Sequence, residues 1–330
     1  MGPTVYLGAY GFGNLGDELC LMEAMRAFPA EESYAQSVAP DWTLRCVPGL
    51  TGCIRRMDEM FALKPARIVY GGGMVGVPHA FSSVLPRLDK AASAGTEVHL
   101  HNMGVSRLTD DVAWRTEAGL RVLASAASFT VRDYVSFEMV IEAGIPRLPG
   151  LTLFPEADIE PDFTLADALL PRDRNLLGIS IIPMEMMRAA LGHEAARVRA
   201  LLSEFDGWGI VPIVSTVHVK SQLDPDLVGS MEFIREFLPS SEVVAPILLD
   251  RAHWHAHLTP KLLKGIIGRC DVLLTQRKHN AIHGIGAGVR VIGLHPIVDD
   301  SLRRTFVALS HRLQPGSYCV GLHTPPGSAA

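Results

Sequence analysis

Arg277, Lys278 and His279 form the segment of this chain with the clearest chemical potential. The segment follows an apolar run at 271–275, typical of a buried strand, and precedes a helix-like run at 280–287. Two fixed positive charges and an imidazole would therefore meet at a helix N-terminus, where backbone N–H groups and the helix dipole favour an anion. The carboxyl end of a strand also faces the ligand crevice of an α/β sheet. The pattern predicts a local anion-binding site.

Two simpler interpretations of the same segment stay open. The turn could be a solvated basic surface, or Arg277 could pair with a carboxylate from a neighbouring helix. Neither interpretation requires a ligand.

A glycine-rich loop near the start of the chain is the second segment of interest. It reads Gly11-Phe-Gly13-Asn14-Leu-Gly16-Asp17-Glu18, follows a strand-like run and opens a helix. Its first six residues satisfy the G-x-G-x-x-G pattern of dinucleotide-binding loops. The acidic residue that would hold a ribose is missing after the next predicted strand, and Asp17 and Glu18 would repel a pyrophosphate. A tight glycine turn capped by Asn14 or Asp17 is the alternative.

Two further segments end predicted strands. Gly71, Gly72 and Gly73 would let the backbone bend sharply or approach a ligand closely. The run Arg132-Asp133-Tyr-Val-Ser136 opens a predicted helix, and its arginine could bind an anion or pair with the adjacent aspartate.

Strands and helices alternate along the chain, which predicts two parallel, doubly wound α/β domains. A proline-interrupted, acidic stretch at 155–173 is the expected linker, so we predict domains at 1–165 and 166–312 and a C-terminal tail at 313–330. The predicted strands lie near 4–9, 43–47, 67–71, 97–102, 128–131, 151–154, 177–182, 209–214, 243–244, 271–275 and 290–294, with helices near 17–28, 52–62, 80–94, 111–125, 134–143, 184–205, 225–237, 259–268, 280–287 and 300–312. Two such domains facing a cleft resemble the B-type glycosyltransferase architecture.

Composition narrows the class of protein. The 330 residues carry a net charge of −5 with the basic residues scattered, so neither nucleic acid nor an anionic membrane is an expected partner. Five cysteines without a C-x-x-C pair argue against a disulfide framework or a structural zinc site and indicate a cytoplasmic protein. We expect no secretion signal and no transmembrane segment. The alternating His253, His255 and His257 lack acidic or thiolate neighbours, so we predict a loop and no metal site.

Taken together, four segments resemble the polysaccharide pyruvyltransferase family in order and spacing. They are the G-N-x-G-D-E loop at 13–18, the glycine strand end at 71–73, the R-D-x-x-S segment at 132–136 and the R-x-H segment at 277–279 with the following G-V-x-V-I strand at 288–292. The resemblance covers about residues 4 to 295. It implies transfer of a pyruvyl group from phosphoenolpyruvate to a sugar-containing acceptor as a ketal, with phosphoenolpyruvate as co-substrate and no further cofactor.

The resemblance also implies roles for individual residues. Arg277 would bind the donor anion and His279 would transfer protons, since planar guanidinium pairing suits carboxylate and phosphate and imidazole titrates near neutrality. We expect additional donor contacts from Arg132, Lys278, Ser136 and Asn280, and acceptor or cleft loops that include Gly13, Asn14, Asp17, Gly72, Gly73, His101 and His218.

This chain departs from the family pattern at several positions. Lys278 stands where the family usually has an apolar residue, the loop at 295–300 lacks the usual tyrosine or lysine, and the run at 101–105 lacks an expected proline. A nucleotide-sugar-dependent glycosyltransferase and a catalytically silent sugar- or anion-binding relative therefore remain alternatives. The acceptor could be a sugar, a lipid-linked glycan or a small polar molecule, and a homo-oligomer is left open.

Overall fold

The chain divides into two compact α/β units. The first comprises 1–12 and 17–156, and the second comprises 13–16 and 157–330, so the glycine loop at 13–16 packs with the second unit. The boundary after residue 156 lies nine residues before the predicted one. The computed structural model describes residues 2–72, 74–75, 78–105, 116–142, 144–145, 147–182, 185–221 and 224–324.

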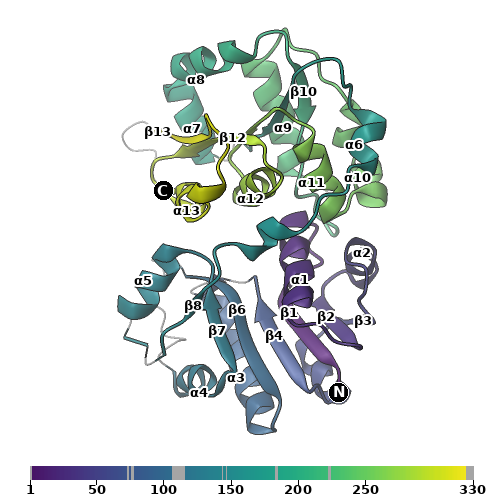
Figure 1. Cartoon of the computed structure of the whole chain (residues 1–330), viewed down its shortest axis with the longest axis vertical. Coiled ribbons are helices and arrows are strands. Elements are labelled where there is room, and N and C mark those ends of the chain that lie inside the picture. The colour runs from purple at the N-terminus through teal and green to yellow at the C-terminus, as the bar shows by residue number, and fades with distance from the viewer. Residues whose placement is uncertain are drawn as a thin grey trace. The chain divides into compact units, whose positions relative to one another are not determined.

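A parallel sheet forms the centre of the first unit (Figure 1). Its strand order is β3-β2-β1-β4-β6-β7-β8, and the short β5 pairs with β6. The strands are β1 (Thr4–Tyr10), β2 (Ser33–Ser37), β3 (Gly52–Ile54), β4 (Arg67–Gly71), β5 (Met74–Val75), β6 (Glu97–Val105), β7 (Ser128–Val131) and β8 (Gly150–Leu151). The helices are α1 (Leu15–Ala27), α2 (Pro40–Cys46), α3 (Pro78–Ser93), α4 (Glu117–Ser125) and α5 (Tyr134–Glu142), with 3-10 turns at Met57–Leu63 and Pro155–Asp158.

The second unit is built in the same way on a five-stranded parallel sheet (Figure 1). Its strand order is β10-β9-β11-β12-β13. The strands are β9 (Leu176–Ser180), β10 (Gly209–Pro212), β11 (Val272–Thr275), β12 (Arg290–Pro296) and β13 (Tyr318–Leu322). The helices are α6 (Thr164–Leu169), α7 (Glu185–His193), α8 (Ala195–Leu202), α9 (Pro225–Phe237), α10 (Arg251–His257), α11 (Pro260–Gly268), α12 (Lys278–Gly286) and α13 (Ser301–Ala308), with 3-10 turns at Ser203–Phe205, Pro246–Leu249 and Ser310–Arg312.

Apolar burial explains why the strand predictions were mostly accurate. The central strands are hydrophobic on both faces, because helices cover both sides of a parallel sheet. The large apolar side chains of β1 and all side chains of β11 are buried, and each unit has its own hydrophobic core. The predicted fold class, two parallel doubly wound α/β domains resembling the B-type glycosyltransferase architecture, is confirmed.

The prediction of a strand at 43–47 was wrong. Pro40 occupies the first turn of α2, with Asp41 in the same turn, and this helix covers most of the predicted strand. The strand that pairs with β1 is β2, which buries the small side chains of Ser33, Ala35 and Ser37 instead of a hydrophobic run. A strand with such a weak apolar pattern is difficult to detect from sequence.

Other predicted elements also changed. The predicted helix at 52–62 is β3 followed by a 3-10 turn, and 243–244 makes only an isolated bridge to Ile210. Residues 318–322, predicted to lie in the C-terminal tail, form β13 and pair with β12. This strand is a short apolar run at an edge of the sheet, and the prediction that it belongs to the tail was wrong.

Glu18 is a buried carboxyl group in the first turn of α1. One oxygen accepts hydrogen bonds from the Gly11 N–H at 2.7 Å and from the Thr43 hydroxyl at 3.5 Å. The other oxygen is buried without a hydrogen-bond partner in the described part of the chain. Burial raises the pKa of Glu18 to about 8. The Glu18 carboxyl group therefore already accepts the Gly11 N–H of the glycine loop. A dinucleotide phosphate would have to bind at this place.

We predict that the Glu18 proton makes stability depend on pH. Because the folded-state pKa is raised from 4.5 to about 8, the stabilisation from this group is full below about pH 4.5 and is lost as the pH rises towards 8. One such group contributes a slope of about 1.4 kcal/mol of unfolding free energy per pH unit. Glu18→Gln should lack this contribution and be more stable than wild type above pH 8.

Urea unfolding between pH 4.5 and 9 measures this difference. Glu31→Gln, at an exposed glutamate, is the control and should follow the wild-type curve. Parallel curves for wild type and Glu18→Gln would contradict the assignment.

Candidate functional site

The turn between β11 and α12 presents Arg277, Lys278 and His279 at the N-terminus of a nine-residue helix. Arg277 is the N-cap residue, with extended backbone angles of φ −80° and ψ 123°. Its N–H donates to the hydroxyl of the buried Thr275 at 2.9 Å. This hydrogen bond fixes the turn at the carboxyl end of the strand, where the sequence predicted it.

The body of α12 is anchored in the core. Asn280 is fully buried and its side-chain amide donates to the Ser180 hydroxyl at 2.6 Å, which links the first turn to β9. His283, one turn later, is also fully buried, and its pKa is lowered to about 3 by burial and by the nearby Lys264. A buried, neutral helix face holds the N-terminus of α12 in place.

A pocket of about 270 Å³ opens at this helix N-terminus within the second unit. Asn14 lines it from the glycine loop, Ser215 and Thr216 follow β10, and Asp299 and Ser301 lie beyond β12. Arg277, Lys278 and His279 complete the polar lining, together with Gln276 and the apolar Ile182. The structure therefore brings four predicted site residues, namely Asn14, Arg277, Lys278 and His279, together around one cavity.

Arg277 also makes an ion pair with Asp226 of α9. Asp226 is 1% exposed, whereas the Arg277 side chain is 34% exposed. Burial raises the pKa of Asp226, and the Arg277 charge opposes that shift. The guanidinium Nε–H is buried and has no hydrogen-bond partner among the described residues. Arg277 is thus paired with a carboxylate of a neighbouring helix, as one interpretation of the sequence has it, and it also lines a pocket. Anion binding there stays a prediction.

The loop at 13–16 owes its glycines to packing. A Cβ atom on Gly13, which has φ +95°, would overlap the Val217 carbonyl, and a Cβ on Gly16 would overlap the His279 ring. Asn14 forms an antiparallel bridge with Thr216, and its side-chain oxygen accepts the Gly16 N–H at 3.0 Å. The predicted glycine turn capped by Asn14 is confirmed.

The loop after β10 was only partly recognised in the sequence. His218 does not line the pocket; its N–H donates to Asp224 at 3.0 Å, and its carbonyl accepts from Arg251 at 2.6 Å. Arg251 also pairs with the buried Asp224. The run Asp224-Pro225-Asp226 therefore anchors this loop and Arg277 at the start of α9. An acidic residue before proline signals a helix start, but no local pattern reveals its distant partners.

The remaining predicted residues belong to the first unit. Arg132 is 5% exposed. Burial raises the pKa of Glu156, and the positive charge of Arg132 acts to lower it. The Ser136 hydroxyl accepts the Val105 N–H at 2.9 Å, and the Ser136 N–H donates to Asp133 at 2.7 Å.

Other residues predicted for the acceptor side also have structural partners. The His101 ring contacts the Glu23 carboxylate at 2.6 Å, with both groups buried. Gly72 has φ +68°, and a Cβ there would lie 2.7 Å from the Cys20 Cβ. Asp17 lies in the first turn of α1, and Gly73 lies outside the described residues. Roles for these residues and for Arg132 and Ser136 in ligand binding stay predictions.

The three alternating histidines lie on α10 and not on the predicted loop. The rings of His253 and His257 lie one turn apart, with centroids 4.7 Å apart and planes tilted by 40°. Over the described ranges, no group of three or more histidine, cysteine, aspartate or glutamate side chains is arranged to hold a metal ion. No helix within those ranges is long and apolar enough to cross a membrane.

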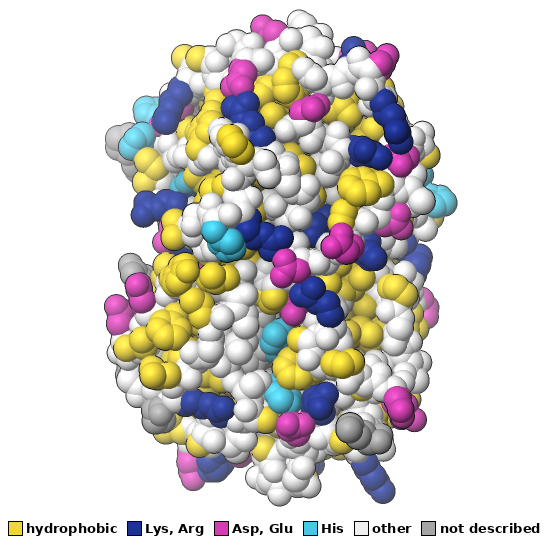
Figure 2. Space-filling view, in the orientation of Figure 1, with side chains coloured by type: hydrophobic (Ala, Val, Ile, Leu, Met, Phe, Trp, Pro, Cys, Tyr) yellow, Lys and Arg dark blue, Asp and Glu magenta, His cyan; other side chains and the backbone are white. Residues whose placement is uncertain are grey.

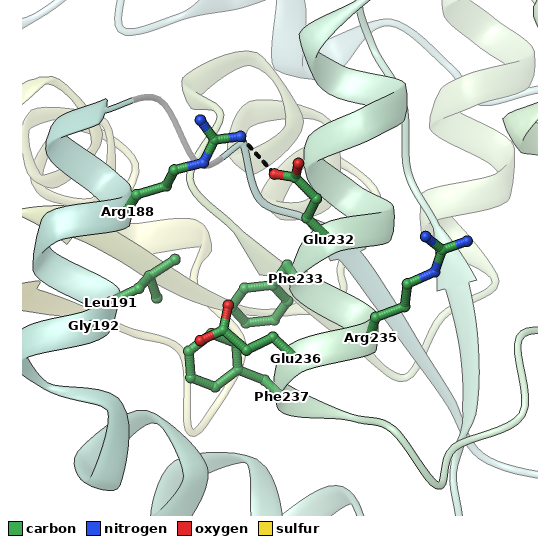
Figure 3. A pocket seen from close by; sticks show the side chains of 8 residues that line it. All are labelled: Arg188, Leu191, Gly192, Glu232, Phe233, Arg235, Glu236 and Phe237. Atoms are coloured by element: carbon green, nitrogen blue, oxygen red, sulfur yellow. Dashed lines mark hydrogen bonds and ion pairs between the residues drawn. The ribbon is translucent and has the colours of Figure 1, made fainter.

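A larger hollow of about 570 Å³ lies between α7 and α9 (Figure 3). Its floor contains the stacked rings of Phe233 and Phe237, and an Arg188–Glu232 ion pair of 2.7 Å crosses it. Basic and acidic side chains are also interspersed over the face of the molecule that Figure 2 shows. The hollow lacks a histidine, so the smaller pocket at α12 is the better candidate for chemistry despite its size.

No protein-family model matches the chain, and no curated protein is similar to it in sequence. Solved structures do resemble it. UDP-GlcNAc 2-epimerase from Methanocaldococcus jannaschii has a TM-score of 0.55 at 11% identity, covering 97% of this chain and 89% of the other. The Neisseria meningitidis enzyme bound to UDP-GlcNAc has a TM-score of 0.53 at 11% identity, covering 89% and 82%. MnaA from S. aureus with UDP has a TM-score of 0.51 at 12% identity, covering 98% and 94%. At such low identity these similarities establish a shared fold.

We predict that Gly16→Ala disturbs the pocket. The added methyl group would overlap the His279 ring, so the imidazole or the glycine loop must move. The expected result is a lower melting temperature and weaker binding of phosphate or sulfate, measured by thermal unfolding and calorimetry. Gly192→Ala is the control, since a Cβ at that helical position meets no atom within 4 Å and alanine favours helix. Unchanged anion binding in Gly16→Ala would contradict the close packing against His279.

Proposed function

We propose that this protein is a transferase that uses phosphoenolpyruvate as donor and forms a pyruvyl ketal on a sugar-containing acceptor. The observation that carries the proposal is the convergence of Arg277, Lys278 and His279 on one small pocket at the N-terminus of α12. The motif resemblance supports the reaction type, and the fold shared with sugar-nucleotide enzymes supports a sugar-related substrate.

The pocket chemistry suits a small, doubly anionic donor. The helix N-terminus and Lys278 supply positive potential, and the Arg277 guanidinium at the pocket wall can donate hydrogen bonds to a carboxylate or phosphate oxygen. A cavity of about 270 Å³ is slightly below the roughly 300–1,000 Å³ of drug-sized ligand sites. A three-carbon phosphorylated acid therefore suits it better than a complete nucleotide sugar.

The proposed reaction needs proton transfer in both directions. Protonation of the donor's methylene carbon makes a methyl group and leaves positive charge on the central carbon. Two acceptor hydroxyls then form C–O bonds to that carbon, lose their protons, and the C–O bond to phosphate breaks. In this proposal His279, which lines the pocket, transfers the protons, while Arg277 and Lys278 stabilise the carboxylate and the departing phosphate.

We expect Arg277→Ala to lower kcat/KM for phosphoenolpyruvate at least tenfold, because a charge-assisted hydrogen bond contributes about 1.5–3 kcal/mol. His279→Gln should lower kcat by roughly 10²–10⁴-fold through loss of proton transfer. Phosphate release over a panel of sugars and nucleotide sugars, with mass spectrometry of the product, measures both. The product should gain the mass of pyruvic acid minus one water.

Arg188→Ala is the matched control, since Arg188 also pairs with a carboxylate of α9 but lies at the other hollow. It should turn over donor like wild type. Full activity in correctly folded Arg277→Ala and His279→Gln would refute the residue assignment.

A nucleotide-sugar-dependent enzyme is the second candidate, favoured by the fold shared with proteins solved with UDP-GlcNAc or UDP. Ligand binding to the folded state raises its stability by RT ln(1 + [L]/Kd), so thermal unfolding separates the two candidates. We expect phosphoenolpyruvate to raise the melting temperature of wild type more than of Arg277→Ala. Stabilisation by UDP-sugars alone would favour the second candidate, and donor binding without phosphate release over the whole panel would indicate a silent relative.

A further inference from the structure

Asp226 is a buried acidic residue at the pocket wall that the sequence did not single out. It lies in the first turn of α9, directly after the Asp224-Pro225 helix start, and its carboxylate accepts a hydrogen bond from an Arg277 NH2 group. The backbone N–H of Thr216, a pocket-lining residue, also binds this carboxylate. Asp226 therefore contacts two parts of the pocket wall.

The arrangement has two separable effects on Arg277. The hydrogen bond from one guanidinium NH2 group to the carboxylate holds the planar head group in one orientation at the pocket wall. The negative charge of Asp226 also offsets the charge of Arg277. A bound anion must therefore interact with a guanidinium that is already partly neutralised, and its own charge is repelled by the carboxylate behind it.

The second carboxylate oxygen of Asp226 lacks a hydrogen bond among the described residues, which indicates that the Asp226–Arg277 ion pair is not optimised for stability alone. This oxygen is buried, and the Asp226 side chain is 1% exposed. An ionised carboxylate at such a site is normally satisfied on both oxygens, because burial without partners is costly. Asp224, two residues earlier, instead binds both the His218 N–H and Arg251.

We propose that Asp226 is a positioning residue that orients Arg277 for the donor and, through its charge, keeps the pocket from binding anions too tightly. The proposal rests on the proposed function in taking this pocket as the donor-anion site. Strong ground-state binding of donor or released phosphate would not accelerate transfer, since only interactions that strengthen in the transition state raise kcat. A carboxylate behind the anion-binding arginine limits ground-state affinity while it preserves geometry.

Three substitutions separate charge from orientation. Asp226→Asn keeps a hydrogen-bond acceptor but removes the charge, so sulfate should bind about tenfold more tightly and KM for phosphoenolpyruvate should fall while kcat changes less than about threefold. Asp226→Glu keeps the charge but is longer by one methylene, so sulfate affinity should stay near wild type while kcat falls at least tenfold. Asp226→Ala should also lose kcat, because nothing then holds the guanidinium.

Sulfate binding by isothermal titration calorimetry is the primary measurement, because sulfate does not change its charge near neutral pH and its binding does not require turnover. Glu232→Gln is the matched control: it removes one negative charge from an arginine-paired carboxylate on the same helix, away from the pocket. It should leave sulfate affinity unchanged within about twofold. Thermal unfolding of each variant confirms that it is folded.

The outcomes distinguish this proposal from the proposed function. Tighter sulfate binding in Asp226→Asn without any turnover of phosphoenolpyruvate by wild type would support the charge effect and refute the pyruvyl donor. Turnover by wild type with equal sulfate affinity in wild type, Asp226→Asn and Glu232→Gln would refute the role of Asp226 and leave the donor intact. A wild-type protein that binds neither sulfate nor phosphoenolpyruvate would overturn both.

Discussion

The ion pair between the buried carboxylate of Asp226 and the partly exposed guanidinium of Arg277 is the interaction around which the candidate site is arranged. It joins the start of α9 to the start of α12, and the same carboxylate binds the backbone of the loop after β10. Three segments distant in sequence are thereby fixed around one cavity. A pair with one buried partner is seldom the most stabilising choice, because desolvation of the carboxylate offsets much of the Coulomb attraction. Its value lies in the defined orientation of the charged groups at the pocket.

The electrostatics of the site depend on which charges are compensated inside the protein. Arg277 is offset by Asp226, and Arg251 is offset by Asp224, so neither arginine acts as an isolated cation. Lys278 and the α12 N-terminus also contribute positive potential at the pocket. Lys278, which departs from the family pattern, thus lies where a compensated arginine alone would provide little net charge.

The fold shared with UDP-GlcNAc 2-epimerases establishes the architecture of this protein but not its reaction. Folds of this kind support different reactions through the residues at their strand ends, so fold similarity at 11–12% identity does not identify a substrate. The G-x-G-x-x-G loop illustrates the same point. Gly13 packs closely against Val217, and Gly16 packs closely against His279. The Gly11 N–H donates its hydrogen bond to the buried Glu18.

The sequence by itself determined the alternation of strands and helices, the parallel sheets and the position of Arg277, Lys278 and His279 at a helix start. These features depend on local hydrophobic patterns and on residues that follow one another in the chain. It did not reveal β2, whose apolar pattern is weak, and the short apolar run of β13 was assigned to the C-terminal tail. Only the tertiary structure decided that Asn14 reaches the pocket, that Asn280 turns into the core and that Asp226 pairs with Arg277. Those contacts join residues far apart in sequence, and no local signal encodes which buried charge will meet which partner.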